Sequence, residues 1–180
     1  EQFDQYATLA RSLGIDAVIT LSNQFAIRAD HHPLTIPKKT KNFIEVGHIS
    51  WLAVKTAALL LVSSRSVQDP EQAFIMTEFL RFLSHDQSGV SHKFRMSSQW
   101  TEVISDVQSG LTLKSRKADR EQTVSDWHQL VKFVSLAIAM KIEAPVLVSM
   151  SNRRRADPDL HFSEDVKNLG DTNSLTAEYD

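Results

Sequence analysis

The first 22 residues place a helix, a glycine turn and a strand in immediate succession, and this order restricts the fold most. One helical face is marked by apolar residues three or four apart: Phe3, Tyr6, Leu9, Ala10 and Leu13. Gly14 follows where helices commonly end in the left-handed conformation. Residues 15–22 (IDAVITLS) are β-branched and apolar at both parities, which predicts a strand buried on both faces. The sequence therefore predicts a helix–strand unit of an α/β fold.

A second strand, four helices and a short αβ ending are predicted further along. The clearest helix start is Asp69-Pro70-Glu71-Gln72. Asp69 can cap the helix, Pro70 suits its first position, and Gln72 can bond back to the cap residue's backbone. The other predicted elements are strands at 43–49, 145–150 and 174–179, helices at 51–63, 98–109 and 118–142, a charged loop at 153–159, and a short helix at 163–169 closed by Gly170.

These elements predict an α/β fold, with α+β as the alternative: a small mixed sheet and a mainly helical middle of about four helices. Residues 1–150 are expected to form this helix-rich body. Residues 151–180 are expected to begin a second αβ segment or to form a C-terminal appendage, because three short elements are too few to bury a core alone.

Composition and charge narrow the function classes. The 180 residues include no cysteine, which excludes disulfides, thiolate metal sites and a cysteine nucleophile, and fits a cytoplasmic protein. The longest apolar run, residues 57–62, is far shorter than a membrane span, so no membrane partner is expected. Residues 157–180 carry seven acids and one base, which leaves the rest of the chain with a net charge of +4. This asymmetry is expected if residues 1–156 bind an anion. It is equally expected if the charged residues only face solvent.

The opening motif carries a resemblance to a known family. Gln2-Phe3-x-x-Tyr6 on a helix, followed by a strand that ends in Leu21-Ser22-Asn23, resembles a late part of the PD-(D/E)XK (restriction-endonuclease-like) nuclease superfamily in its RecB-like branch. The stretches LSNQF, HHP, HISW, DPEQAFIMTEFLRFL and SGVS resemble an uncharacterised bacterial branch with a nuclease-like front and a helical body. The alternative is that Gln2 and Tyr6 are simply surface and core residues of an amphipathic helix.

The resemblance implies which chemistry to expect. The family cleaves nucleic acid with an Asp and a Glu-x-Lys on two strands that precede the motif and hold a divalent metal such as Mg²⁺. Those strands are absent from this chain, so the resemblance implies a fragment with no catalytic residue, no metal and no cofactor of its own. The expected function is binding or acting on nucleic acid, in defence or stress response. The alternative is a non-catalytic interaction module that oligomerises through its helices.

Three basic clusters are the candidate nucleic-acid contacts, because lysine and arginine can neutralise backbone phosphates. Solvated loops are the alternative interpretation. The clusters comprise Lys38, Lys39 and Lys41; Arg116, Lys117 and Arg120; and Arg153, Arg154 and Arg155.

The histidines predict no metal site. His31 and His32 are adjacent, and adjacent side chains in an extended loop point in opposite directions, so they and His48 do not form a ligand set. The chain holds no helical His-x-x-x-His or Glu-x-x-His pair, and His85 and His128 are interpreted as helix-end and helix-surface residues. No Gly-x-Ser-x-Gly elbow or Gly-rich loop is present, which disfavours serine hydrolase, NAD and P-loop functions. Trp51, Trp100 and Trp127 lie on apolar helical stripes and are expected in the core.

Overall fold

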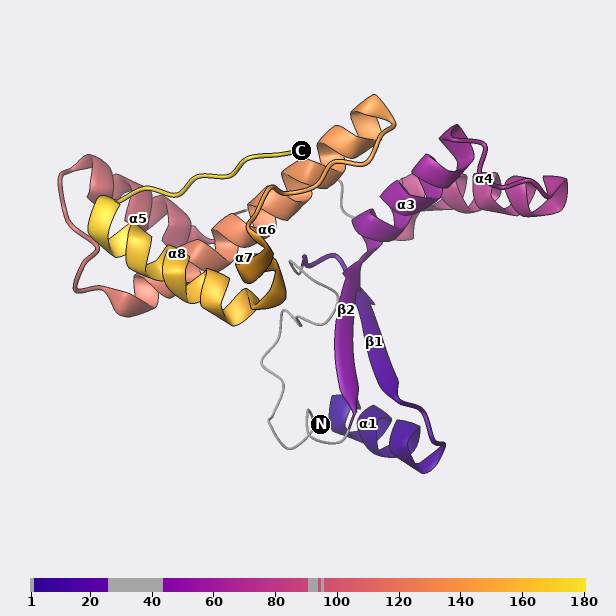
Figure 1. Cartoon of the computed structure of the whole chain (residues 1–180), viewed down its shortest axis with the longest axis horizontal. Helices are drawn as coiled ribbons and strands as arrows, with labels where there is room; N and C mark the ends of the chain where they lie inside the picture. Colours follow the sequence, from indigo (N-terminus) through magenta and orange to yellow (C-terminus); the bar gives the residue numbers. More distant parts are fainter. Residues whose placement is uncertain (1, 26–43, 91–93, 95) are drawn as a thin grey trace. The chain divides into compact units, whose positions relative to one another are not determined.

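The structure is a computed structural model that describes residues 2–25, 44–90, 94 and 96–180. It is a mixed α/β fold in which residue contacts divide the chain into two compact units, Glu1–Ser91 and His92–Asp180 (Figure 1). The helices between residues 152 and 172, which belong to the predicted C-terminal segment, pack within the second unit. Among the described residues, no helix is both long and apolar enough to cross a membrane.

The first unit opens with the predicted helix–turn–strand. Helix α1 (Gln2–Ser12) ends in a Schellman turn, in which the N–H of Ile15 donates to the Ala10 carbonyl at 2.9 Å and that of Gly14 donates to Arg11 at 3.1 Å. Gly14 has a φ of +68°, which explains the glycine at this position. The turn leads directly into strand β1 (Ala17–Ser22). The prediction of this unit is confirmed.

Strands β1 and β2 (Glu45–Ser50) pair in parallel, so the sheet of the described residues is parallel rather than mixed. The face that carries Val18 and Val46 packs against Ala7 and Ala10 of α1. On the other face Ile19 is 58% exposed and Leu21 47% exposed. The prediction that this strand is buried on both faces is wrong, because the side chains of a strand alternate and only one set meets α1.

Helix α3 (Trp51–Ser63) follows β2 directly, and Ser50 caps it by accepting a 3.1 Å hydrogen bond from the N–H of Ala53. Helix α4 (Pro70–Ser84) begins as predicted: the Asp69 carboxylate accepts hydrogen bonds from the N–H groups of Glu71 at 2.8 Å and Gln72 at 3.0 Å. A 3₁₀ turn, η1 (Asp86–Ser88), then leads to the left-handed Gly89. The apolar stripe of α4 is largely exposed, and its buried residue is Leu83.

The second unit is built around α6 (Lys117–Ile142), against which α5 (Ser98–Gln108) and α8 (Pro158–Thr172) pack (Figure 1). With α3 and α4, helices α5 and α6 account for the four helices predicted for the middle of the chain. Trp51, Trp100 and Trp127, all expected in the core, are each partly buried. The buried cluster of this unit consists of Val103, Leu113, Val124, Val166 and Leu169, with Val107, Phe162 and Leu175 packed against it.

Two predicted strands are wrong in the second unit. Residues 145–150 and 174–179 are extended segments joined by one antiparallel bridge, Val148 to Tyr179. Three backbone hydrogen bonds, Leu147 N–H to Asp180, Asp180 N–H to Leu147, and Ser149 N–H to Glu178, hold the segments together at 2.8–3.1 Å. A pairing this short is not a strand, since each segment meets its partner over a few residues only.

The charged loop predicted at 153–159 is helical instead. Residues Asn152–Ala156 form the short helix α7, and Asp157 caps α8 by accepting a 2.9 Å hydrogen bond from the N–H of Leu160. Pro158 occupies the first turn, so Asp157-Pro158 repeats the signal of Asp69-Pro70. Helix α8 also continues through Gly170 to Thr172. The missing Cβ of Gly170 leaves the space that the Arg120 guanidinium occupies.

Removing the cap of α8 should lower stability measurably. We expect Asp157→Ala to lower the free energy of unfolding by about 1 kcal/mol, because the first-turn N–H groups lose their acceptor. Urea unfolding followed by circular dichroism measures this change. Asp157→Asn is the matched control, since asparagine caps about as well as aspartate. Equal losses for alanine and asparagine would contradict the capping role.

Candidate metal centre in the second unit

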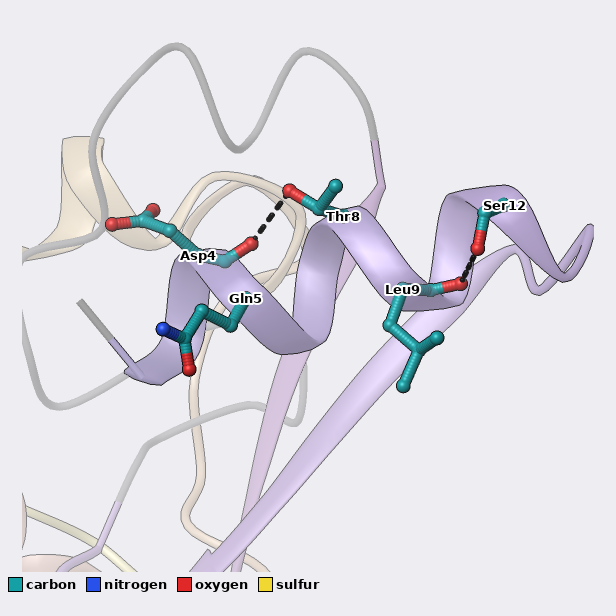
Figure 2. A pocket seen from close by; sticks show the side chains of 5 residues that line it. All are labelled: Asp4, Gln5, Thr8, Leu9 and Ser12. Atoms are coloured by element: carbon teal, nitrogen blue, oxygen red, sulfur yellow. Dashed lines mark hydrogen bonds between the residues drawn. The ribbon is translucent and has the colours of Figure 1, made fainter.

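The residues predicted from the opening motif lie on α1. Gln2 begins the helix, and its side chain lies outside the described part of the structure. Tyr6 is 54% exposed, so it is not a core residue of this unit. Figure 2 shows a hollow on α1 that is lined by Asp4, Gln5, Thr8, Leu9 and Ser12. The hydroxyls of Thr8 and Ser12 donate to carbonyls of the same helix, at 2.8 and 2.7 Å. The motif remains a prediction.

Three of the predicted nucleic-acid contacts are used within the fold. Arg116 forms ion pairs with Asp106 and Asp119, and these hydrogen bonds raise its pKa. Arg120 donates to the backbone carbonyls of Leu113 and Lys114. The Nε of Arg154 donates to Glu164 at 2.8 Å. These contacts reduce what the three guanidinium groups can offer a phosphate backbone.

The other predicted contacts are exposed or lie outside the described residues. Lys117 is exposed, and its Nζ lies 3.5 Å from Oε1 of Glu121. Arg153 and Arg155 are exposed on α7. A groove in this unit brings Lys117 and Arg120 together with residues that were not predicted. The complete lining is Lys114, Lys117, Arg120, Glu121, Phe162, Ser163, Val166, Lys167 and Asp171. The cluster of Lys38, Lys39 and Lys41, like His31 and His32, falls outside the described residues.

His48 is a hydrogen-bonded sheet residue. It is buried on β2, its Nδ1 lies 2.8 Å from the Thr20 hydroxyl, and its Nε2 lies 3.1 Å from the Gln24 carbonyl oxygen. The Ser22 hydroxyl is a further partner of Nε2 at 3.3 Å. Both ring nitrogens are therefore engaged within the first unit. His85 stands at the end of α4, as predicted, where its Nδ1 accepts from the N–H of Gln87.

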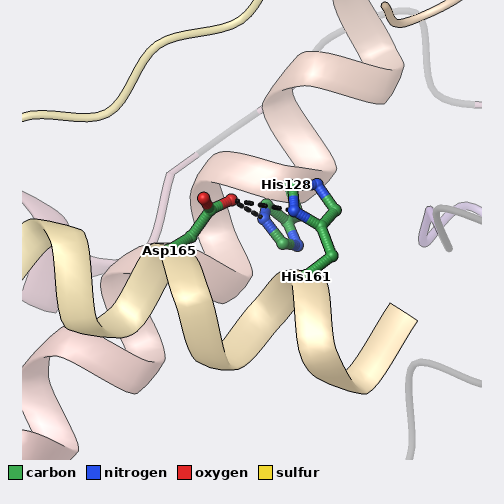
Figure 3. A group of neighbouring side chains, drawn as sticks. All are labelled: His128, His161 and Asp165. Atoms are coloured by element: carbon green, nitrogen blue, oxygen red, sulfur yellow. Dashed lines mark hydrogen bonds and ion pairs between the residues drawn. The ribbon is translucent and has the colours of Figure 1, made fainter. Parts of the chain in front are cut away.

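His128, His161 and Asp165 form a buried cluster between α6 and α8, and we call it the HHD cluster (Figure 3). The interpretation of His128 as a surface residue is wrong: it is 8% exposed, because α8 packs over it. His128 Nε2 lies 2.7 Å from Asp165 Oδ2, and His161 Nδ1 lies 3.4 Å from the same oxygen. The two imidazole rings stack with centroids 4.6 Å apart. The three ligand atoms lie within 4.8 Å of one another.

The local sequence explains how α8 presents this cluster. The Asp157-Pro158 cap sets the start of the helix, so His161 and Asp165 fall one turn apart on the same face. Phe162, next to His161, places its ring at 82° to the His128 ring with centroids 5.8 Å apart. His161-x-x-x-Asp165 is the signal that could have revealed two members of the cluster from the sequence. His128 carries no such signal, since its partners are 33 or more residues away.

The charges of the HHD cluster suit a cation. Burial raises the pKa of Asp165, but the hydrogen bond from His128 and the charges of His161, His128 and Arg154 outweigh it, so the net pKa is lowered. Burial, and then the charge of His128, lowers the pKa of His161. Its Nδ1 is buried and has no hydrogen-bond partner in the structure described. At neutral pH the cluster therefore pairs a carboxylate with a neutral imidazole whose ring nitrogen is unsatisfied.

A cavity of about 190 Å³ adjoins the HHD cluster. Trp127 and Val131 of α6 provide an apolar wall, and Arg154 of α7 provides a cation. Arg154 Nη1 lies 3.6 Å from Asp165 Oδ1, the carboxylate oxygen that does not face the histidines. The remaining lining comes from two short extended stretches, 148–150 and 176–178. The cluster is thus accessible from one small, mostly polar hollow.

Comparison with protein-family models, with the curated proteins and with the solved structures gave no match to this chain.

Proposed function

We propose that the second unit binds a divalent transition-metal ion, best matched by Zn²⁺, through His128 Nε2, His161 Nδ1 and Asp165 Oδ2. The observation that carries this proposal is the convergence of the three ligand atoms within 4.8 Å at a buried position. Two imidazoles and one carboxylate form a donor set that suits Zn²⁺ and its neighbours better than Ca²⁺ or Mg²⁺, which prefer oxygen ligands alone.

The distances agree with this donor set. Two ligand atoms on a tetrahedral zinc ion, each about 2.0–2.1 Å from it, are separated by roughly 3.3 Å. His161 Nδ1 and Asp165 Oδ2 are 3.4 Å apart, whereas His128 Nε2 and Asp165 Oδ2 are hydrogen-bonded at 2.7 Å. An ion would replace the proton of that hydrogen bond and widen the pair. Binding would also satisfy the buried Nδ1 of His161, which a purely structural hydrogen-bond network leaves unpaired.

Titration with Zn²⁺ tests the proposal. We expect calorimetry to show one ion per chain, and a thermal shift that reflects about 2.7 kcal/mol of added stability when free Zn²⁺ is 100 times the Kd. His161→Ala should weaken binding at least 100-fold, because one ligand of three is lost. His85→Ala is the matched control, since His85 is an exposed histidine outside the HHD cluster. Wild-type protein that binds no Zn²⁺, or a His161→Ala variant that binds it unchanged, contradicts the proposal.

We also propose that the chain binds nucleic acid without cleaving it, as the nuclease resemblance implies. The groove of the second unit supports this, because Lys114, Lys117 and Lys167 line it together with the Phe162 ring. Lysines can follow phosphates, and an aromatic ring can stack on a base. This groove is a separate feature from the cavity beside the HHD cluster.

Charge reversal in the groove should reduce nucleic-acid affinity and its salt dependence. The plot of log K against log salt has a negative slope. We expect Lys117→Glu and Lys167→Glu each to make this slope less steep by about 0.7–0.9, since each removes one phosphate contact. Fluorescence anisotropy with a labelled DNA at several salt concentrations measures the slope. Lys141→Glu, at an exposed lysine outside the groove, serves as the control. Slopes equal to the wild type in both groove variants would exclude this surface.

The interaction-module alternative remains a prediction. Phe74, Ile75 and Phe82 on α4 are exposed apolar residues of the kind that protein interfaces use. Light scattering on the purified chain decides it: a stable dimer favours this alternative, and a monomer at high concentration removes its oligomerisation part.

A further inference from the structure

The cavity beside the HHD cluster points to a ligand as well as a metal. We infer that a metal ion held by the cluster and the guanidinium of Arg154 together form a subsite for a phosphate group. This inference rests on the proposed metal binding. Arg154 and all three members of the cluster line the same cavity.

Three protein ligands leave room on the ion. Zinc sites with four protein ligands are closed, whereas sites with three keep a position for water or substrate. Among the described residues, the HHD cluster provides three ligands for a metal ion. Because each of these side chains lines the cavity, the open position of the ion faces this space.

The charge of the occupied site favours an anion. A divalent ion with two neutral imidazoles and one carboxylate keeps a net charge of +1, and Arg154, whose own charge is paired with Glu164, lines the same cavity with further N–H donors. The hydrogen bond to Glu164 uses one of the five N–H donors of the guanidinium, and Nη1 lies 3.6 Å from Asp165 Oδ1, beyond hydrogen-bond distance. A planar guanidinium presents paired donors that match two oxygens of a phosphate.

Two features of the cavity limit what fits. Its volume of about 190 Å³ is below the 300–1,000 Å³ of typical small-molecule pockets, so it admits an inorganic phosphate or a terminal phosphate rather than a whole nucleotide. The exposed Glu178 also lines it and repels free anions. Selection therefore depends on the coordinate bond to the ion together with the Arg154 contact, and we expect no phosphate binding without metal.

Cobalt provides the test, because Co²⁺ can occupy zinc-type sites and, unlike Zn²⁺, absorbs visible light. The full chain is loaded with Co²⁺ and titrated with inorganic phosphate, a 5′-phosphorylated oligonucleotide, and the same oligonucleotide without the phosphate. We expect the cobalt absorption to change saturably with inorganic phosphate. A change with the phosphorylated oligonucleotide as well, but not with the unphosphorylated one, would identify a nucleic-acid end as a source of the group. A change with inorganic phosphate alone would identify the free ion.

Arginine variants locate the second contact. Arg154→Met should keep Co²⁺ binding and weaken phosphate binding at least tenfold, whereas Arg81→Met, at an exposed arginine of the first unit, should change neither. If Arg154→Met no longer binds Co²⁺, Arg154→Lys is tested in its place. Lysine keeps the positive charge but lacks the paired N–H donors of the guanidinium, so this variant should bind Co²⁺ and bind phosphate more weakly.

The outcomes separate the two proposals. Failure of the wild type to bind Co²⁺ and Zn²⁺ overturns the metal site itself. Wild-type protein that binds Co²⁺ but shows no response to phosphate overturns the subsite alone. Phosphate binding of unchanged strength in the Arg154 variant that retains Co²⁺ overturns the role of Arg154.

Discussion

Replacing Asp165 with alanine is expected to lower the free energy of unfolding by about 1–3 kcal/mol, because a buried hydrogen-bond partner is lost, and to abolish metal binding. Asp165 is buried and is the common partner of His128, His161 and Arg154. Without the carboxylate, the buried Nε2 of His128 loses its hydrogen-bond partner, and an unsatisfied buried polar group costs about this much. The loss of the carboxylate also removes the ligand that both histidines share.

Two variants sharpen the Asp165 test. Asp165→Asn keeps the volume and an acceptor for His128, so it should lose less stability than alanine while it still binds metal poorly. Asp171→Ala, at an exposed acid on the same helix, should change stability by less than about 0.5 kcal/mol. Urea unfolding without metal measures stability, and calorimetry with Zn²⁺ measures binding. Unchanged stability in Asp165→Ala would show that the cluster does not hold α8 on α6.

Leu113→Ala should destabilise the second unit by about 2–5 kcal/mol. Leu113 is 0% exposed and packs in the buried cluster with Val103 and Val124. Truncation of a buried leucine loses the transfer free energy of its methyl groups and leaves a cavity, which together produce losses of this size. Thermal and urea unfolding of the full chain measure the effect.

A neighbouring leucine gives the control for Leu113. Leu111 belongs to the same connection between α5 and α6 and is 53% exposed, so Leu111→Ala should change stability by less than about 0.5 kcal/mol. The substitutions remove the same atoms two residues apart, and only burial differs. Equal effects of the two would contradict the described packing of this connection.

Much of the helical framework could be predicted because its signals are local. The Gly14 turn, the Asp69-Pro70 cap and the long helix before residue 143 appear in the structure near the predicted positions. Each depends on a backbone conformation or a hydrogen bond within a few residues, which the side chains there decide. The start of α8 carries the same signal in Asp157-Pro158, within a run of charged residues that predicts a loop.

Burial and pairing could not be predicted in the same way. Residues 145–150 and the strand β1 are both short and apolar, yet the first forms a single bridge and the second keeps one exposed face. A run of apolar residues does not state how many partners it will meet, since the partners come from distant parts of the chain. The predictions of strand number and of two-sided burial failed for this reason.

The amino-acid sequence by itself determined local features such as the end of α1 at Gly14 and the start of α4 at Asp69, and it placed His161 and Asp165 four residues apart. Tertiary structure alone decided that His128, more than 30 residues earlier, is buried against that turn at 2.7 Å from Asp165. Capping and glycine turns act over three or four residues, whereas the packing of α8 on α6 depends on the shapes of both helices at once. The candidate metal centre depends on this packing of α8 on α6.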